Sequence, residues 1–270
     1  MEEFDFVTRD QFGVVKFLTF LSIFILASIL QYKFPHQNSF TSVLKNWRVN
    51  LSLAGANAVL MAGICGGCLC ALALYVKQHH LGVFDMIGLL YWGQIASTLI
   101  LFDLVAYAVH RLYHQNKWLW PLHAVHHADI VFETSTALRF HPLELLISLG
   151  VRLAFVLIFG PPLLAIVFFE ILFAYFNLLE HSDIILPQKL ERILAPLFIT
   201  PSMHRRHHSM KERITPNFGT ILSLWDILFG TLNVRGPQEV IDVGTPGIGE
   251  RHMTFGSLVL HPFVAWREMR

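Results

Sequence analysis

The sequence predicts an all-α integral membrane protein. We expect a helical bundle of about three spanning helices plus a hairpin, with a cytoplasmic helical cap that holds a polyhistidine di-metal site. Three observations predict this class. Charged residues make up 14% of the chain, well below the roughly 25% typical of soluble domains. Several apolar segments are long enough to cross a bilayer. Most of the fifteen histidines lie in tight groups just past such segments.

Five apolar segments follow one another along the chain, over residues 12–31, 51–76, 83–109, 143–159 and 163–180. Because about 20 apolar residues cross the hydrocarbon core, the first three are predicted to span the membrane. Gly160-Pro161-Pro162 separates the last two and predicts a hairpin, either fully spanning or re-entrant. Arg152 argues against the fourth segment spanning alone. The resulting divisions are membrane helices over 1–82, a histidine-bearing catalytic domain over 83–232 and a C-terminal tail over 233–270.

Basic residues predict the orientation, because cytoplasmic loops carry an excess of Lys and Arg. Such residues lie between segments one and two, between three and four, and after segment five, whereas only Lys77 lies between two and three. The N-terminus is acidic. This pattern places the N-terminus outside and every histidine group on the cytoplasmic face.

Three histidine boxes have ligand spacing: His110-x3-His114, His123-x2-His126-His127 and His204-x2-His207-His208. Spacings of three and four residues on a helix aim several imidazoles toward one point. His181 follows segment five and is a ninth candidate. Nine nitrogen ligands fit two ions with positions left open for oxygen. Two irons are the interpretation we favour, although affinity order alone leaves zinc or copper open.

Three further residues are expected to support these ligands. Asp103 and Tyr107 lie two turns and one turn before His110, respectively. We expect Asp103 to accept a hydrogen bond from a ligating imidazole; pairing with a basic residue is the alternative. Asn177 lies four residues before His181 and is either a weak ligand, a supporting donor or a helix-packing amide. His141 is expected to orient the site or to meet the headgroup region.

Composition excludes several classes of function. The net charge of +1 gives no support for nucleic-acid binding. No nucleotide-binding glycine motif is present, and the cysteines fit neither a haem nor an iron–sulfur pattern. Cys65-x2-Cys68 lies within an apolar segment and is better explained by helix packing. Electrons should therefore come from a separate carrier at the basic cytoplasmic face, where Arg205 and Arg206 are candidate contacts.

The order of these boxes resembles that of the fatty acid hydroxylase / sterol desaturase superfamily of integral-membrane di-iron oxygenases. Asp103-x3-Tyr107-x2-His110, the 139–144 segment RFHPLE and the 224–231 segment LWDILFGT add to the resemblance, which covers about 85–232. One departure is visible: relatives often carry Asp-x-Asn-Tyr-Gly after the last box, where this chain has Thr215-Pro-Asn217-Phe218-Gly219. The resemblance implies that nine histidines bind two irons, namely His110, His114, His123, His126, His127, His181, His204, His207 and His208.

It further implies O2 as co-substrate and attack on an unactivated lipid C–H bond, giving hydroxylation or, as the alternative, desaturation of a sterol, fatty acyl or ether lipid. A cytochrome b5-like or ferredoxin-type carrier with an NAD(P)H reductase would supply electrons. A bacterial inner membrane is favoured over the endoplasmic reticulum.

Two rival classes of function remain. A membrane zinc hydrolase would need a carboxylate general base beside its ligands, and none of the boxes contains one. A metal transporter would hold its ligands at mid-membrane or in a loop.

Overall fold

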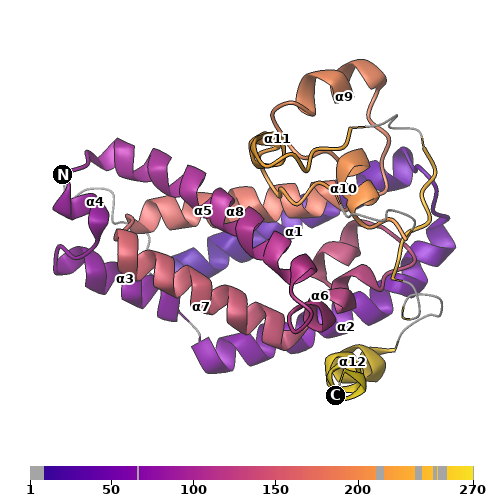
Figure 1. Cartoon of the computed structure of the whole chain (residues 1–270), viewed down its shortest axis with the longest axis horizontal. Helices are drawn as coiled ribbons and strands as arrows, with labels where there is room; N and C mark the ends of the chain where they lie inside the picture. The colour runs from indigo at the N-terminus through magenta and orange to yellow at the C-terminus, as the bar shows by residue number, and fades with distance from the viewer. Residues whose placement is uncertain are drawn as a thin grey trace.

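The structure is a computed structural model and describes residues 9–65, 67–210, 216–234, 239–245, 248 and 254–269. Its regular elements within these ranges are all helical. The long helices run along one axis of the molecule (Figure 1) and are α1 (Arg9–Lys33), α2 (Phe40–Cys65), α3 (Cys68–Gln78), α5 (Tyr91–Gln115), α7 (Pro142–Phe159) and α8 (Leu163–Glu180). The remaining helices are α4 (Val83–Met86), α6 (Trp120–His127), the 3-10 helix η1 (Thr134–Leu138), α9 (Gln188–Leu194), α10 (Pro201–His207), α11 (Leu224–Leu228) and α12 (Phe255–Glu268).

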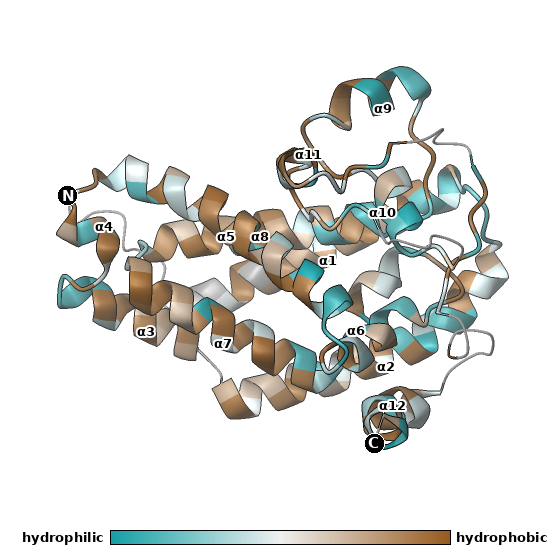
Figure 2. Ribbon diagram, in the orientation of Figure 1, coloured by the Kyte–Doolittle hydropathy of each residue, from teal (hydrophilic) through white to brown (hydrophobic). Residues whose placement is uncertain are grey.

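Aromatic rings form the centre of the bundle. Helix α8 packs against α1 and α5, and α7 packs against α3. The Phe102 ring lies 4.0 Å from that of Phe155 and 4.9 Å from that of Phe169, measured between centroids. Apolar residues also dominate the outside of the long helices (Figure 2). A bundle that is apolar both inside and outside is suited to a lipid surrounding rather than to water.

Five stretches of the described chain are long and apolar enough to cross a membrane: Gly13–Lys33, Phe40–Met86, Tyr91–Gln115, Pro142–Phe159 and Leu163–Glu180. This confirms the prediction of a mostly helical, apolar bundle. Two predicted boundaries were wrong. The second segment begins at Phe40 and its helix ends at Cys65, because Gly67 takes a left-handed conformation before α3. The third helix begins at Tyr91 rather than at 83, after a turn at Gly88 with φ +64°.

Two glycines allow a close backbone contact at the end of the bundle where α7 meets the α3–α4 turn. A Cβ atom on Gly82 would lie 2.5 Å from the Gly160 nitrogen, and one on Gly160 would lie 2.3 Å from the Leu81 carbonyl oxygen. Both glycines also have positive φ, which residues with a Cβ rarely adopt. The break predicted from Gly160-Pro161-Pro162 is therefore the turn that joins α7 to α8.

The short helices α6, α9, α10 and α11 gather at the opposite end, where polar residues are frequent (Figures 1 and 2). Helix α12 lies within the segment predicted as a tail. Leu258 of α12 packs with Leu53 of α2 and Val125 of α6. The C-terminal segment is thus packed against the histidine-bearing helix α6, while the predicted domain limits at 82 and 232 remain a prediction.

Candidate metal centre

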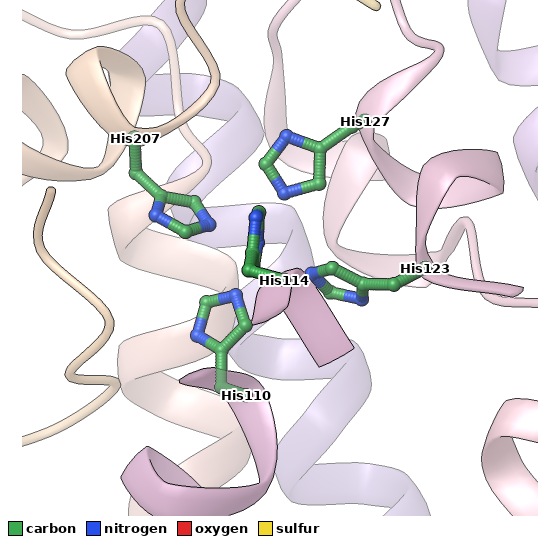
Figure 3. Close-up of side chains that lie close together, drawn as sticks. All are labelled: His110, His114, His123, His127 and His207. Atoms are coloured by element: carbon green, nitrogen blue, oxygen red, sulfur yellow. The ribbon is translucent and has the colours of Figure 1, made fainter. Parts of the chain in front are cut away.

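The nine predicted histidines meet in two groups at the polar end of the bundle. Within each group, one side-chain nitrogen from every residue lies within 4.8 Å of the others. The five-histidine cluster contains His110, His114, His123, His127 and His207, whose rings point toward one another (Figure 3). The four-histidine cluster contains His126, His181, His204 and His208. The sequence prediction therefore identified a set of side chains that the fold brings together.

Each HxxHH box divides between the two clusters, and helix geometry explains why. Residues four apart on an α-helix differ by only about 40° around its axis, whereas adjacent residues differ by about 100°. His123 and His127 of α6 accordingly share the five-histidine cluster, and His126 turns to the other. At the end of α10, His204 and His208 share the four-histidine cluster while His207 turns away. Two short helices therefore supply ligands to both clusters.

Fixed acceptors orient three imidazoles of the five-histidine cluster. His110 Nδ1 donates to the Phe218 carbonyl at 2.9 Å, and His207 Nδ1 donates to the Pro216 carbonyl at 2.8 Å. His123 Nδ1 donates to Glu144 Oε1 at 2.7 Å. A carbonyl or carboxylate oxygen can only accept, so the proton of each ring lies on Nδ1 and the lone pair on Nε2. In the described part of the chain, the Nε2 atoms of these three rings are buried and have no hydrogen-bond partner.

The four-histidine cluster is fully buried and its rings contact one another. His181 Nδ1 donates to the Asn177 carbonyl at 2.7 Å. Its Nε2 lies 3.0 Å from His126 Nε2 and 2.9 Å from His204 Nε2. Glu180 Oε2 lies 3.7 Å from His204 Nδ1. His181 is therefore the central ring of this cluster, with a carboxylate beside it.

These donor sets fit metal ions. Buried polar atoms are normally hydrogen-bonded, so a group of converging lone pairs without partners is suited to binding a cation. Burial also lowers the pKa of His181 and of His207 to about 3, so both rings are neutral near pH 7. Neutral imidazole is the form that binds a metal. Two clusters of such ligands provide for two ions, and a supporting acceptor on the other ring nitrogen is the usual partner of a ligating histidine.

Sequence reasoning missed the two carboxylates that support the clusters. Glu144 belongs to the 139–144 segment RFHPLE and lies in the first turn of α7, where it reaches His123. Glu180 directly precedes His181 at the end of α8. The sequence held a signal for each: Glu144 lies inside a motif of the resembling family, and Glu180 is adjacent to the candidate ligand His181.

The prediction that Asp103 contacts an imidazole was wrong. Both carboxylate oxygens of Asp103 instead accept bonds from the Ile221 and Leu222 backbone and from the Trp225 indole, at 2.8–3.3 Å. Asp103 lies seven residues before His110, which is about 10 Å along the helix, beyond the reach of a short side chain. Its role is to hold the segment after Phe218. Tyr107 likewise faces this segment, where its hydroxyl bonds to Thr231 at 2.9 Å.

The remaining candidates have structural contacts. The Asn177 side-chain amide donates to the Ala137 carbonyl at 3.1 Å, while its backbone carbonyl holds His181. His141 caps α7, with Nδ1 accepting from the Leu143 N–H. In the segment after the last box, Asp226 accepts from the Phe218 and Gly219 N–H groups, both at 2.8 Å. Thr215 of this segment lies outside the described residues.

The proposed carrier contacts at Arg205 and Arg206 were wrong, because both side chains are buried. Arg205 lies 3.7 Å from Asp183 and donates to the Ile184 carbonyl. Arg206 bonds to Glu239 at 2.7 Å. A buried guanidinium engaged in this way is a packing element of the cap and cannot present its charge to a partner protein.

A buried polar network fastens the segment after α6 to α2. Asn46 donates to Asp129 at 2.9 Å and to Glu133 at 3.0 Å, and the Trp47 indole donates to Glu133 at 2.9 Å. Arg139 Nε donates to the Val125 carbonyl in the last turn of α6 at 3.0 Å. Burial, together with the neighbouring Asp129 charge, raises the pKa of Glu133 to about 7. These bonds hold a helix of only eight residues in place.

A cavity of about 120 Å³ leads from both clusters into the bundle between α5, α7 and α8. His110, His126, His181 and their neighbours line one part. Apolar side chains line much of the rest, including Phe102, Val105, Val109, Val151, Phe169 and Phe173. A space that joins a metal-ligating end to an apolar interior suits a lipid.

The structure therefore defines a membrane-type helical bundle with two histidine clusters that are able to bind metal ions. Comparison with known proteins agrees: residues 95–231 match the fatty acid hydroxylase family, and the chain belongs to it. Together with its five apolar stretches, this makes it an integral membrane protein.

Several relatives share part of this chain. Ornithine lipid hydroxylase OlsE of Rhizobium tropici is 30% identical over 156 residues, covering 57% of this chain and 46% of the relative. Human alkylglycerol monooxygenase is 30% identical, covering 53% and 32%. Methylsterol monooxygenase 2-2 of Arabidopsis thaliana is 26% identical, covering 59% and 61%. The chain thus spans less than two thirds of the length of each. No solved structure matches it.

Proposed function

We propose that this protein is an O2-dependent di-iron oxidoreductase that hydroxylates a C–H bond of a membrane lipid, with desaturation as the alternative outcome. The observation that carries the proposal is the opening of both histidine clusters into one largely apolar cavity. The matched relatives are named as a lipid hydroxylase and as monooxygenases, which supports the same chemistry. The lipid itself is a sterol, fatty acyl or ether lipid in this proposal.

Two bound irons would supply O2 activation at the end of the cavity. The five-histidine and four-histidine clusters would hold one ion each through their unpartnered nitrogens. Glu144 and the carbonyls of Phe218 and Pro216 would keep the rings in the ligating tautomer. The apolar walls would exclude water and hold the lipid chain, so that the reacting carbon is positioned beside the clusters.

Electrons would come from a separate one-electron carrier, either cytochrome b5-like or ferredoxin-type. The loop charges support a cytoplasmic position for the cap and the clusters, with about three spanning helices plus the α7–α8 hairpin. Lys211 and Arg213, which contribute to this charge pattern, lie outside the described residues. A bacterial inner membrane remains the favoured location. Since Arg205 and Arg206 are buried, the carrier would have to dock elsewhere on the cap.

The test is lipid mass spectrometry on cells grown under ¹⁸O2 and expressing wild type, His207→Ala or His80→Ala. His207 belongs to the five-histidine cluster, whereas the His80 side chain is 87% exposed and lies outside both clusters. A lipid that gains one labelled oxygen in wild type and His80→Ala only would establish hydroxylation. Loss of two hydrogens without label would establish desaturation. Identical lipids in all three strains, in a host that supplies iron and a reductase, would contradict the proposal.

A further inference from the structure

A charged pair lies inside the bundle, beside the cavity. Arg152 of α7 forms an ion pair with Glu170 of α8. Each residue is ten positions from the cap end of its helix, Pro142 or Glu180, which is about 15 Å along the axis. Ionisable side chains at such depth in a membrane bundle are costly and usually serve a site.

Arg152 and Glu170 differ in what they face. The Glu170 side chain is 6% exposed, whereas that of Arg152 is 27% exposed and lines the cavity. The Arg152 guanidinium lies 5.3 Å from the ring centroid of Phe173, another lining residue. A guanidinium carries five N–H donors in a planar fork. Glu170 accepts from one nitrogen of the guanidinium, and since the Arg152 side chain lines the cavity, its other donors are available to a ligand there.

The position of the pair sets a distance. Glu144, which holds His123, precedes Arg152 by eight residues on the same helix, or about 12 Å. If the reacting carbon of a lipid lies at the clusters, the part of the lipid beside Arg152 lies roughly 12 Å away from that carbon. A plain hydrocarbon chain there would leave the donors of Arg152 without acceptors, which is unfavourable in an apolar cavity.

We propose that Arg152 is a specificity residue that binds the ester or amide carbonyl of an acyl lipid, and that Glu170 orients it. This rests on the proposed function and names the substrate class of the same cavity. A carbonyl oxygen is an uncharged acceptor, so it can accept from Arg152 without bringing a second negative charge toward Glu170. Sterols without such a group and unsubstituted hydrocarbons are excluded as preferred ligands.

The test measures binding to the metal-free full chain in nanodiscs, so it does not depend on catalysis. Three radiolabelled probes of equal chain length are compared, with empty nanodiscs as background: methyl palmitate, palmitate and hexadecane. A hydrogen bond to a charged group contributes about 1.5–3 kcal/mol, so wild type should bind methyl palmitate at least about tenfold more tightly than hexadecane. Arg152→Met/Glu170→Met removes both charges of the ion pair together and should abolish the preference.

Arg152→Lys serves as the matched variant, because it keeps the charge and loses the fork; it should retain only part of the preference. Reconstituted iron content and melting temperature report whether each variant is folded. Equal binding of the three probes by wild type, or a preference that survives in the double variant, would overturn the proposal. Tighter binding of palmitate would overturn the carbonyl assignment in favour of a free carboxylate. A lipid product in cells despite either result would leave the hydroxylase proposal standing.

Discussion

The two histidine clusters are built by different means, although the same two short helices contribute to both. Three rings of the five-histidine cluster are fixed from outside, by two loop carbonyls and by Glu144. In the four-histidine cluster, His181 is held by a backbone carbonyl, and the rings of His126 and His204 contact His181 directly. The first cluster is thus positioned by its surroundings and the second largely by its own members. Removing one ring should therefore have different consequences in the two.

The largest expected effect comes from removing the central ring of the four-histidine cluster. His181→Ala leaves three imidazoles and deletes the contact that joins His126 to His204, so iron content should fall by about one ion per chain and product formation should be lost. His114→Ala leaves four imidazoles in the other cluster and should retain its iron with weaker affinity. Metal analysis of both purified variants measures this. Equal iron loss in the two would remove the distinction between the clusters.

The next effect concerns the carboxylates. Glu144→Gln keeps the shape of the side chain but removes the charge that makes His123 a stronger ligand, so iron affinity or turnover should fall about 10–100-fold. Glu180→Gln should cost less, because Glu180 lies 3.7 Å from His204, beyond hydrogen-bond distance. Asp85→Asn is the control, since Asp85 pairs with Lys77 at the opposite end of the bundle. A larger loss in Glu180→Gln than in Glu144→Gln would reverse our ranking.

A smaller effect, on stability, is expected from substituting Asp103, which holds the segment that follows Phe218. Asp103→Asn replaces one of two accepting oxygens with an amide that faces N–H donors, which should lower the free energy of unfolding by about 1–3 kcal/mol. Thermal unfolding in detergent measures it. Trp225→Phe deletes a single donor to Asp103 and should cost less. If Asp103 acted on a ligand directly, iron would be lost without any loss of stability.

The smallest expected effect is a dependence of protein stability on pH. It arises from Glu133, in the buried polar network that holds α6 in place. The pKa of Glu133 is about 7 in the folded protein and 4.5 in an ordinary environment. The folded state therefore binds the Glu133 proton more tightly than the unfolded state does. The stabilising contribution of this proton is complete below pH about 4.5 and is lost as pH rises through 7. Melting temperature should decline over that window in wild type and decline less in Glu133→Gln. Parallel curves for the two proteins would show that Glu133 does not titrate there.

Much of the bundle and the ligand set could be predicted from sequence, because both depend on local spacing. Apolar length predicts helices, and three- and four-residue spacing predicts converging imidazoles. The breaks at Gly67 and Gly88 were missed because the left-handed backbone at a glycine does not alter hydropathy. The distribution of ligands between two ions needed the relative placement of α5, α6, α8 and α10.

Burial of charge was the other failure of prediction. Arg205 was expected at the surface, yet Asp183 lies beside it in the fold and 22 positions earlier in the chain. Glu144 reaches His123 across 21 positions, and Asp103 reaches Trp225 across 122. Such partnerships depend on the packing of separate helices, which residue spacing in a single sequence does not contain.

The stacked rings of Phe102, Phe155 and Phe169 have a consequence for permeability. They fill the bundle below the cavity, and beyond them the Gly82–Gly160 contact brings the backbones together. Aromatic packing therefore closes the bundle between the cavity and that backbone contact. Vesicles containing the protein should hold an ion gradient as well as vesicles without it, which separates a closed catalytic chamber from a conduit for metal ions.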